Sequence, residues 1–198
     1  NLLQLQRELR EERWQPSPYR YFVVHHTKDR VVAEAAFADR VVHHALVAAL
    51  EPAFEPHFIA DSYACRKGKG THLAMRRAQA LALQGGYFLR LDVRRYFDHI
   101  HHPTLLALLA QRLNDARTLR LCARLLAGAS VPHIPTVEQR GVPIGNLTSQ
   151  FWANVYLDPI DRLIESRVGA GNYLRYMDDM VAFAPSKADL WRTKDVVA

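Results

Sequence analysis

The segment from Asn172 to Ala184 constrains the fold more than any other stretch, because it holds Asp178 and Asp179 between two apolar, aromatic-rich runs. Aromatic and β-branched residues favour strands, whereas Asp favours the turn between them. The pattern therefore predicts a β-hairpin whose tip carries both carboxylates. Like charges held side by side repel each other, so we expect a cation at this tip, and carboxylate oxygens suit a divalent metal. The alternative is an ordinary surface turn that contains two Asp residues.

A second strand is predicted over residues 87–93, where apolar and polar side chains alternate. The alternation places Asp92 on the face that points away from the buried side. If this strand pairs with the hairpin, Asp92 converges with Asp178 and Asp179. A cluster of carboxylates binds hard cations, and two Mg²⁺ ions a few ångströms apart can support nucleotidyl transfer. Separate acids on separate strands remain the alternative.

Helical patterns fill much of the remaining chain. An amphipathic pattern predicts a helix from about Phe37 to Leu50, which ends at Glu51 because proline disfavours helical geometry in the residue before it. Pro159 is expected to kink or end the long helix that contains Trp152. Because helices outnumber the strands at 87–93 and 173–184, we predict the α+β class, with a small antiparallel sheet backed by helices.

The charge distribution indicates an anionic partner. The 198 residues carry a net charge of +6 and a sequence pI near 9.5. Residues 62–91 contain no acid, and their basic side chains include the loop Cys65–Gly70, which precedes a helix that Thr71 is expected to cap. A basic loop before a helix is a natural phosphate site, although part of this charge could be a solvated helix face. The loop is not a Walker A motif, since Tyr63 occupies the position of its first glycine.

Two cysteines without C-x-x-C spacing favour a reducing compartment. No signal peptide is evident, and no apolar run approaches about 18 residues, so we expect a cytoplasmic protein, bacterial or phage-encoded, with no membrane partner. The chain begins at Asn1 rather than Met and stops at Ala198 inside a helical pattern. We therefore expect a fragment of a longer protein.

The ordered motifs resemble those of reverse transcriptases. LRYMDDMVAF looks like the catalytic hairpin of that family, and LDVRRYFDHI looks like its first palm motif, with Asp92 followed by the aromatic Phe97. Three further segments are similar to family motifs in the same order: KDRVVAEAAFADRVVHHAL, DSYACRKGKGTHLAM and GVPIGNLTSQFWANVYLDPIDRLI.

This resemblance implies a right-hand polymerase fold consisting of fingers and palm. Residues 1–86 would form the fingers with an N-terminal helix, and residues 87–198 mostly the palm, with 103–140 as helical packing and loop; the thumb is not present. The implied activity is RNA-directed DNA synthesis from dNTPs on an RNA template with a primer that grows into cDNA. The implied cofactor is a pair of Mg²⁺ ions, for which Mn²⁺ is an alternative.

The resemblance also implies site residues. Asp92, Asp178 and Asp179 would be catalytic, and the metals would be held by these three and the backbone carbonyl of Val93. Phe97 would be the steric gate that excludes a ribose 2′-hydroxyl. The other residues implied at the dNTP site are Lys28, Arg30, Pro143, Ile144 and Gly145, and the implied template contacts are Arg66, Lys67, Lys69, Ser149 and Gln150.

The second palm motif departs from most relatives, because Ile144 stands where they have Gln. The form IGNLTSQ resembles the reverse transcriptases of diversity-generating retroelements, as do DRVVHHAL and SYACRKGKGTH. That subtype implies error-prone copying at template adenines and a basic accessory protein as partner. Replacing an amide by Ile144 removes a polar group that helps to fix the template and nucleotide.

Two other functions remain open. One is a maturase or RNA-binding role, as in relatives encoded by group II introns, which would not need Asp92. The other is a palm-type nucleotide cyclase or a template-independent defence polymerase, which would need the acids but no template. Phe97 and the basic residues of the fingers argue against the cyclase.

Overall fold

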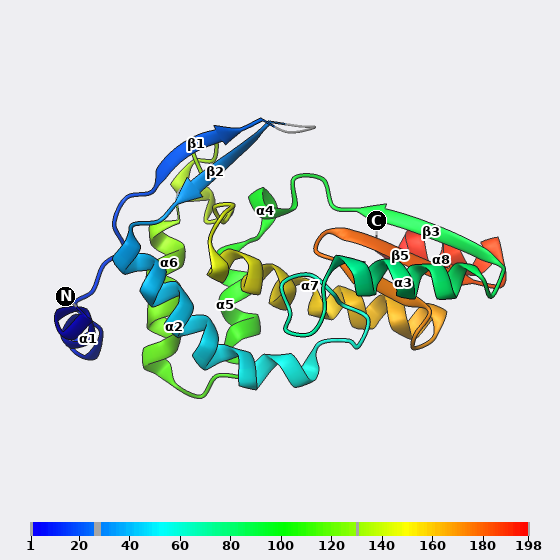
Figure 1. Cartoon of the computed structure of the whole chain (residues 1–198), viewed down its shortest axis with the longest axis horizontal. Helices are drawn as coiled ribbons and strands as arrows, with labels where there is room; N and C mark the ends of the chain where they lie inside the picture. Colours follow the sequence, from blue (N-terminus) through cyan, green and yellow to red (C-terminus); the bar gives the residue numbers. More distant parts are fainter. Residues whose placement is uncertain (1, 26–28, 130, 198) are drawn as a thin grey trace. The chain divides into compact units, whose positions relative to one another are not determined.

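The computed structural model of the chain describes residues 2–25, 29–129 and 131–197 (Figure 1). They form two compact units, the first drawn from residues 1–56 and 97–156 and the second from residues 57–96 and 157–198. This division does not follow the predicted boundary at residue 86, and the names fingers and palm stay predictions.

In chain order the elements are α1 (Leu2–Arg10), β1 (Arg20–Val24), β2 (Arg30–Glu34), α2 (Phe37–Phe54), η1 (Glu55–His57), α3 (Thr71–Ala82), β3 (Tyr87–Asp92), α4 (Tyr96–His99), α5 (His102–Ala110), α6 (Ala116–Gly128), η2 (Thr136–Glu138), α7 (Leu147–Val168), β4 (Tyr173–Tyr176), β5 (Asp179–Ala184) and α8 (Lys187–Val197).

The second unit is built on a three-stranded antiparallel sheet in the order β3-β5-β4. The predicted hairpin is confirmed: β4 and β5 pair through four positions, from Tyr173 opposite Ala182 to Tyr176 opposite Asp179. The predicted strand at 87–93 is also confirmed, since β3 pairs with β5 along its length. The predicted mixed architecture with small antiparallel sheets is therefore correct.

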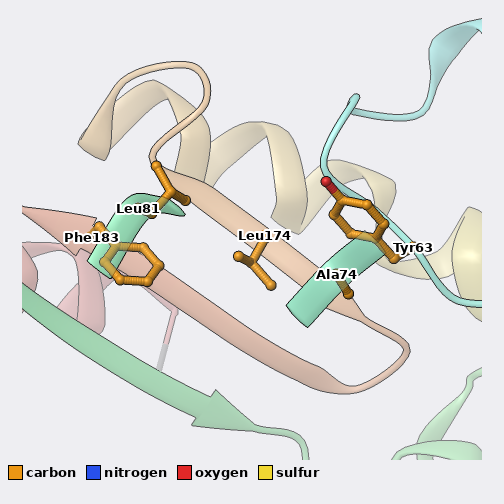
Figure 2. Packing of buried hydrophobic residues seen from close by; sticks show 5 residues of the cluster. All are labelled: Tyr63, Ala74, Leu81, Leu174 and Phe183. Carbon is orange, nitrogen blue, oxygen red and sulfur yellow. The ribbon is translucent and has the colours of Figure 1, made fainter. Parts of the chain in front are cut away.

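The core of the second unit lies between this sheet and α3 (Figure 2). Leu174 and Phe183 point from the sheet towards Ala74 and Leu81 of α3, and Tyr63 closes the cluster from the preceding loop. All five side chains are at most 9% exposed. Removing this apolar surface from water holds the strands against the helix, which fixes the hairpin that carries the acids.

The first unit contains the antiparallel β1–β2 hairpin and a helical core. Leu50 of α2, Leu105 and Leu109 of α5 and Leu125 of α6 are each at most 1% exposed. Within the described residues, no helix has both the length and the apolarity that a bilayer crossing requires.

Two local predictions were wrong. The helix that begins at Phe37 continues through Pro52 to Phe54, because Leu50 and Phe54 are buried and their packing offsets the backbone hydrogen bond that proline removes. Thr71 is not the cap of α3, since Gly70 occupies the N-cap position. Instead, Thr71 Oγ1 donates to the hydroxyl of Tyr176 at 3.0 Å.

The helix α7 does not end at Pro159 but runs from Leu147 to Val168. Pro159 is exposed, whereas Leu157 and Ile164 on the same helix are 5% and 0% exposed. Burial on both sides of the proline keeps the helix continuous despite the missing donor. The last helix, α8, has a side-chain cap, since the Asp189 amide donates to Ser186 Oγ at 3.2 Å.

Candidate active site

Two of the predicted acids face each other across neighbouring strands. Asp92 ends β3, Asp179 begins β5, and the two are register partners. Residues directly opposite in an antiparallel pair project to the same side of the sheet, with Cβ atoms roughly 5 Å apart. Both side chains are exposed. Strand pairing therefore brings Asp92 and Asp179 together, as predicted, and Val93 follows immediately after the end of β3.

The third acid, Asp178, lies in the turn between β4 and β5, where only Met177 and Asp178 separate the strands. Met177 has φ 58°, and Asp178 is not among the residues with positive φ. A two-residue hairpin with positive φ at the first position matches a type II′ turn, which normally places Gly there. Holding a non-glycine residue in this region costs on the order of 1–3 kcal/mol. The surrounding structure must therefore hold this turn in place.

Arg90 forms an ion pair with one of the acids. Its Nη2 lies 2.8 Å from Oδ1 of Asp179, and the two side chains are 69% and 50% exposed. The hydrogen bond to Asp179 and the charge of that carboxylate raise the pKa of Arg90. Solvent screens such an exposed pair, so it can exchange for another cation at little cost.

The acids offer the donor chemistry that Mg²⁺ requires, namely carboxylate oxygens at one end of a sheet. Among the residues that the structure describes, however, no group of three or more His, Cys, Asp or Glu side chains is arranged to hold a metal ion. The backbone thus provides the Asp92–Asp179 pairing, and Asp178 sits one residue before Asp179. The complete three-carboxylate metal site stays a prediction.

The predicted dNTP-binding segments come together in the first unit through backbone hydrogen bonds. The amide of Ala33 on β2 donates to the Ile144 carbonyl at 2.8 Å, and the amide of Val142 donates to the Phe97 carbonyl at 2.9 Å. Arg30 opens β2 and is exposed, whereas Pro143 is buried and both Phe97 and Ile144 are half-buried. Lys28 lies outside the described residues.

Gly145 has a physical reason to be glycine. Its φ is +117°, and a Cβ atom there would lie 2.8 Å from Val32 Cγ1 and 2.9 Å from the Ala33 carbonyl oxygen. Both the conformation and the contact exclude a side chain. The backbone of Gly145 thus closely approaches β2.

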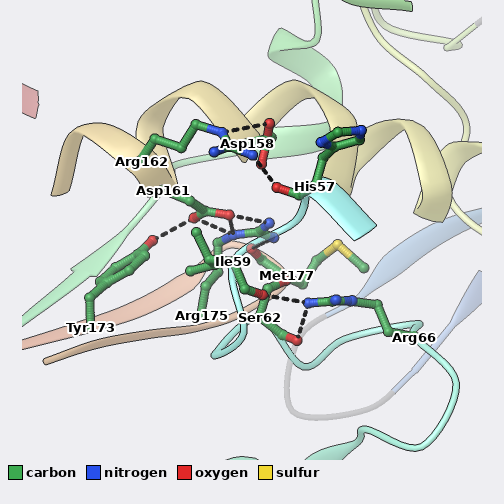
Figure 3. Close-up of polar contacts among 10 residues, drawn as sticks. All are labelled: His57, Ile59, Ser62, Arg66, Asp158, Asp161, Arg162, Tyr173, Arg175 and Met177. Atoms are coloured by element: carbon green, nitrogen blue, oxygen red, sulfur yellow. Dashed lines mark hydrogen bonds and ion pairs between the residues drawn. The ribbon is translucent and has the colours of Figure 1, made fainter. Parts of the chain in front are cut away.

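The predicted template residues differ in their hydrogen bonds and in their exposure to solvent. Arg66 Nη1 donates to the carbonyls of Ile59 at 2.7 Å and Ser62 at 2.9 Å (Figure 3). Lys69 Nζ donates to the Ala60 carbonyl at 2.6 Å. These two cations therefore stabilise the loop that contains them. The sequence alone did not predict this role. Lys67 is exposed and Gln150 is half-buried, but Ser149 is 1% exposed and so is not presented to a template in this conformation.

Sequence reasoning missed a buried polar cluster beneath the hairpin. Arg175 on β4 and Asp161 on α7 form an ion pair in which both side chains are 0% exposed, and Tyr173 Oη donates to Asp161 Oδ1 at 2.8 Å (Figure 3). Burial raises the pKa of Asp161, and Arg175 opposes that rise. The sequence held one indication of this cluster: side chains alternate between the two faces of a strand, so Tyr173 and Arg175 of β4 lie on the same face.

The chain is similar to known proteins over nearly its whole length. The sequence model of the family described as reverse transcriptase (RNA-dependent DNA polymerase) matches residues 24–198. The chain is 28% identical over 207 residues to Protein YkfC of Escherichia coli (strain K12), which covers 98% of this chain and 54% of that protein. It is 24% identical over 160 residues to the group II intron-encoded protein LtrA of Lactococcus lactis subsp. cremoris, which covers 79% of this chain and 27% of LtrA.

A solved structure of telomerase from Candida albicans, in complex with a TWJ fragment of telomeric RNA, shares the fold. The TM-score is 0.57 at 11% sequence identity, and the match covers 95% of this chain and 41% of that chain. The chain thus spans about half the length of YkfC and a smaller part of LtrA. Because the family model covers most of the sequence, including all three acids, the chain belongs to the reverse transcriptase (RNA-dependent DNA polymerase) family.

Proposed function

We propose that this chain carries the catalytic site of an RNA-directed DNA polymerase, which extends a primer along an RNA template. The observation that carries the proposal is the β3–β5 register, which places Asp92 opposite Asp179, next to the turn residue Asp178. Family membership supplies the reaction class. Exposed carboxylates gathered at one end of a sheet are the arrangement that a nucleotidyl transfer requires.

In this reaction the primer 3′-oxygen forms a bond to the α-phosphorus of the incoming dNTP, and the bond from that phosphorus to the pyrophosphate oxygen breaks. The 3′-hydroxyl gives its proton to solvent in the same step. We assign Asp92, Asp178 and Asp179, with the Val93 carbonyl, as the groups that would hold two Mg²⁺ ions. Such ions, when bound, activate the attacking oxygen and stabilise charge on the leaving phosphate.

The remaining roles follow from the dNTP-site and template residues. We propose that Arg30 and Lys28 bind the triphosphate, since a guanidinium can make paired hydrogen bonds to phosphate oxygens. Phe97 would exclude the ribose 2′-hydroxyl. Pro143, Ile144 and Gly145 would support the new base pair, and the backbone bond from Ala33 to Ile144 favours this by joining that turn to the strand of Arg30.

The experiment is primer extension on a defined RNA template. Asp178→Asn keeps the shape of the side chain but removes its charge, so we expect extension to be lost while folding and template affinity are kept. Asp195→Asn is the matched control, because Asp195 is an exposed acid on α8. Retained extension by the Asp178→Asn protein would contradict the proposal.

A finer proposal is that the polymerase belongs to a diversity-generating retroelement, copies template adenines with errors and works with a basic accessory protein. The residues that support this are Ile144 and the segment that follows it. Ile144 is half-buried and its carbonyl is held by Ala33, so its side chain occupies a defined place in the turn. An apolar side chain there offers no hydrogen bond to template or nucleotide.

The second candidate is a maturase-like RNA-binding role, which the similarity to the group II intron-encoded protein LtrA favours. The two functions separate cleanly by experiment. If an Asp92→Asn protein still assists RNA splicing, binding rather than synthesis is the function. Omission of the template distinguishes a template-independent polymerase, since only that enzyme would still incorporate dNTPs.

A further inference from the structure

Arg175 is the charged residue buried directly beneath the catalytic turn. Its Nε and Nη2 atoms each lie 2.7 Å from an oxygen of Asp161, and its Nη1 donates to the Met177 carbonyl at 2.9 Å (Figure 3). The side chains of Arg175 and Asp161 are 0% exposed. One guanidinium therefore joins helix α7 to the turn that contains Asp178.

The Met177 carbonyl belongs to the peptide that decides the shape of this turn. In a two-residue hairpin, rotation of the peptide between the two central residues changes the turn type by changing ψ of the first and φ of the second. Here the second residue is Asp178. A donor fixed on the Met177 oxygen thus fixes the backbone from which the Asp178 carboxylate projects. The positive φ of Met177 makes such a restraint necessary.

The guanidinium can act as a restraint because it is itself held on all sides. Asp161 accepts from it through both carboxylate oxygens, and Tyr173 Oη donates to the same carboxylate at 2.8 Å. The backbone of Arg175 is hydrogen-bonded as well. Its amide donates to the Asp61 carbonyl, and its carbonyl accepts from the Tyr63 amide, each at 2.9 Å. Although burial alone lowers the pKa of a guanidinium, Asp161 raises the pKa of Arg175 overall, so it stays charged.

We propose that Arg175, oriented by Asp161, is a positioning residue that holds the Met177–Asp178 peptide in the orientation catalysis needs. The inference rests on the proposed polymerase function, but it concerns a property of the turn that can be measured without any activity. The alternative is that the Arg175–Asp161 pair only stabilises the second unit.

The test must remove the restraint without leaving a buried charge unpaired. Arg175→Met alone leaves Asp161 without its cation, and such proteins are strongly destabilised. The triple variant Asp161→Leu, Tyr173→Phe, Arg175→Met removes both charges and the hydroxyl that would lose its acceptor. Apolar replacement of a whole buried ion pair is often neutral for stability. Tyr173→Phe alone keeps the bond to Met177, and Arg162→Met replaces an exposed arginine on α7.

The first readout is steady-state primer extension by the 198-residue chain. The positioning role predicts that the triple variant, matched to wild type in its urea midpoint, loses kcat by about 100-fold with KM for dNTP within about twofold, because misplacement by about 1 Å costs this much. Tyr173→Phe, which removes one support of Asp161 but keeps the bond to Met177, should lose much less kcat than the triple variant, and Arg162→Met should keep the wild-type kcat. If the triple variant has both the wild-type stability and the wild-type kcat, the Arg175–Asp161 pair is only structural and the proposal is overturned.

The second readout is methyl NMR of the same proteins labelled at Met, of which the chain has three: Met75, Met177 and Met180. The positioning role predicts one sharp Met177 signal in the wild type and a broadened or doubled signal in the triple variant, where the peptide is released. Met75 on α3 should not change, and Met180, which lies opposite Arg175 in the register, should shift but stay single. An unchanged Met177 signal overturns the proposal. If the wild-type protein extends no primer while the Met177 signal still changes in the triple variant, the polymerase function alone is refuted.

Discussion

Arg90 Nη2 donates to Oδ1 of Asp179 at 2.8 Å, which places a positive charge directly beside the proposed catalytic acids. The two residues lie on β3 and β5, and Arg90 precedes Asp92 by two positions on the same strand face. The charge of Asp92 also contributes to the raised pKa of Arg90. In the proposed site, Arg90 would therefore compete with a metal ion for the same carboxylate.

Arg90→Gln should lower the Mg²⁺ concentration needed for half-maximal primer extension by about fivefold, roughly the effect of one unit charge at a hydrated surface. The measurement is a Mg²⁺ titration at constant ionic strength. Arg20→Gln is the matched control, because Arg20 forms an exposed pair with Glu34 in the first unit. An equal or higher Mg²⁺ requirement in the Arg90→Gln protein would show that Arg90 does not compete.

Ile144→Gln should reduce misincorporation opposite template adenines by roughly tenfold, since one positional hydrogen bond can contribute about 1–1.5 kcal/mol. Sequencing of cDNA made from a defined RNA by wild type and variant measures the change. Ile144→Leu is the control, because it keeps the side chain apolar. The hypothesis fails if the Gln and Leu proteins have the same adenine error rate as wild type.

Gly145→Ala should lower the free energy of unfolding by roughly 2–4 kcal/mol, because it adds a clash to a strained conformation. The clash is with Val32 Cγ1 and the Ala33 carbonyl, which a Cβ would approach to 2.8 and 2.9 Å. Gly85→Ala separates the two effects, since Gly85 has φ +84° but no atom within 4 Å of an added Cβ. Urea unfolding should therefore show a smaller loss for Gly85→Ala; equal losses would rule out the close approach.

The protein should lose stability as the pH falls below about 6.5, and His43 should account for part of that loss. Burial lowers the pKa of His43 from the ordinary value of 6.5, so the unfolded chain takes up a proton in a pH range where the folded chain does not. Stability is thus complete above the unfolded pKa and falls as the pH drops towards the folded pKa. The slope for one proton is at most about 1.4 kcal/mol per pH unit.

His43→Asn tests this prediction, because Asn can still bond Thr148, which lies 2.7 Å from His43 Nδ1, but cannot titrate. Urea unfolding at pH 7.5 and 5.5 should show a smaller pH-dependent loss in this variant than in wild type. Some loss should remain, since burial also lowers the pKa of His102. His44→Asn, a change in the exposed neighbour on α2, should keep most of the wild-type loss.

The parts of the fold that the sequence predicted well are those in which local pattern and packing agree. The hairpin at 173–184 has two apolar runs around a turn sequence, and β3 alternates towards Asp92, so each could be predicted separately. The end of α2 could not be predicted, because the burial of Phe54 beyond Pro52 is a tertiary effect that outweighs a local preference.

The residue types of the candidate site could be predicted, but the side chains that hold its loops and turn in place could not. Carboxylates at strand ends are visible in the sequence, whereas the burial of Arg175 is not, because arginine is almost always exposed and its partner Asp161 lies on a different element. The same applies to Arg66 and Lys69. Their charge predicted phosphate binding, but only the folded loop shows carbonyls placed to accept from them.

The backbone bond between Ala33 and Ile144, together with the contact of Gly145 against Val32, has a mechanical consequence. The strand that begins at Arg30 cannot bend towards a bound nucleotide without pulling the 143–145 turn along with it. Binding of the triphosphate and support of the base pair would then be a single movement, so that the energy of holding the phosphates also tightens the surface under the bases. In the proposed polymerase, discrimination of base-pair shape would then depend on the same strand and turn that bind the triphosphate.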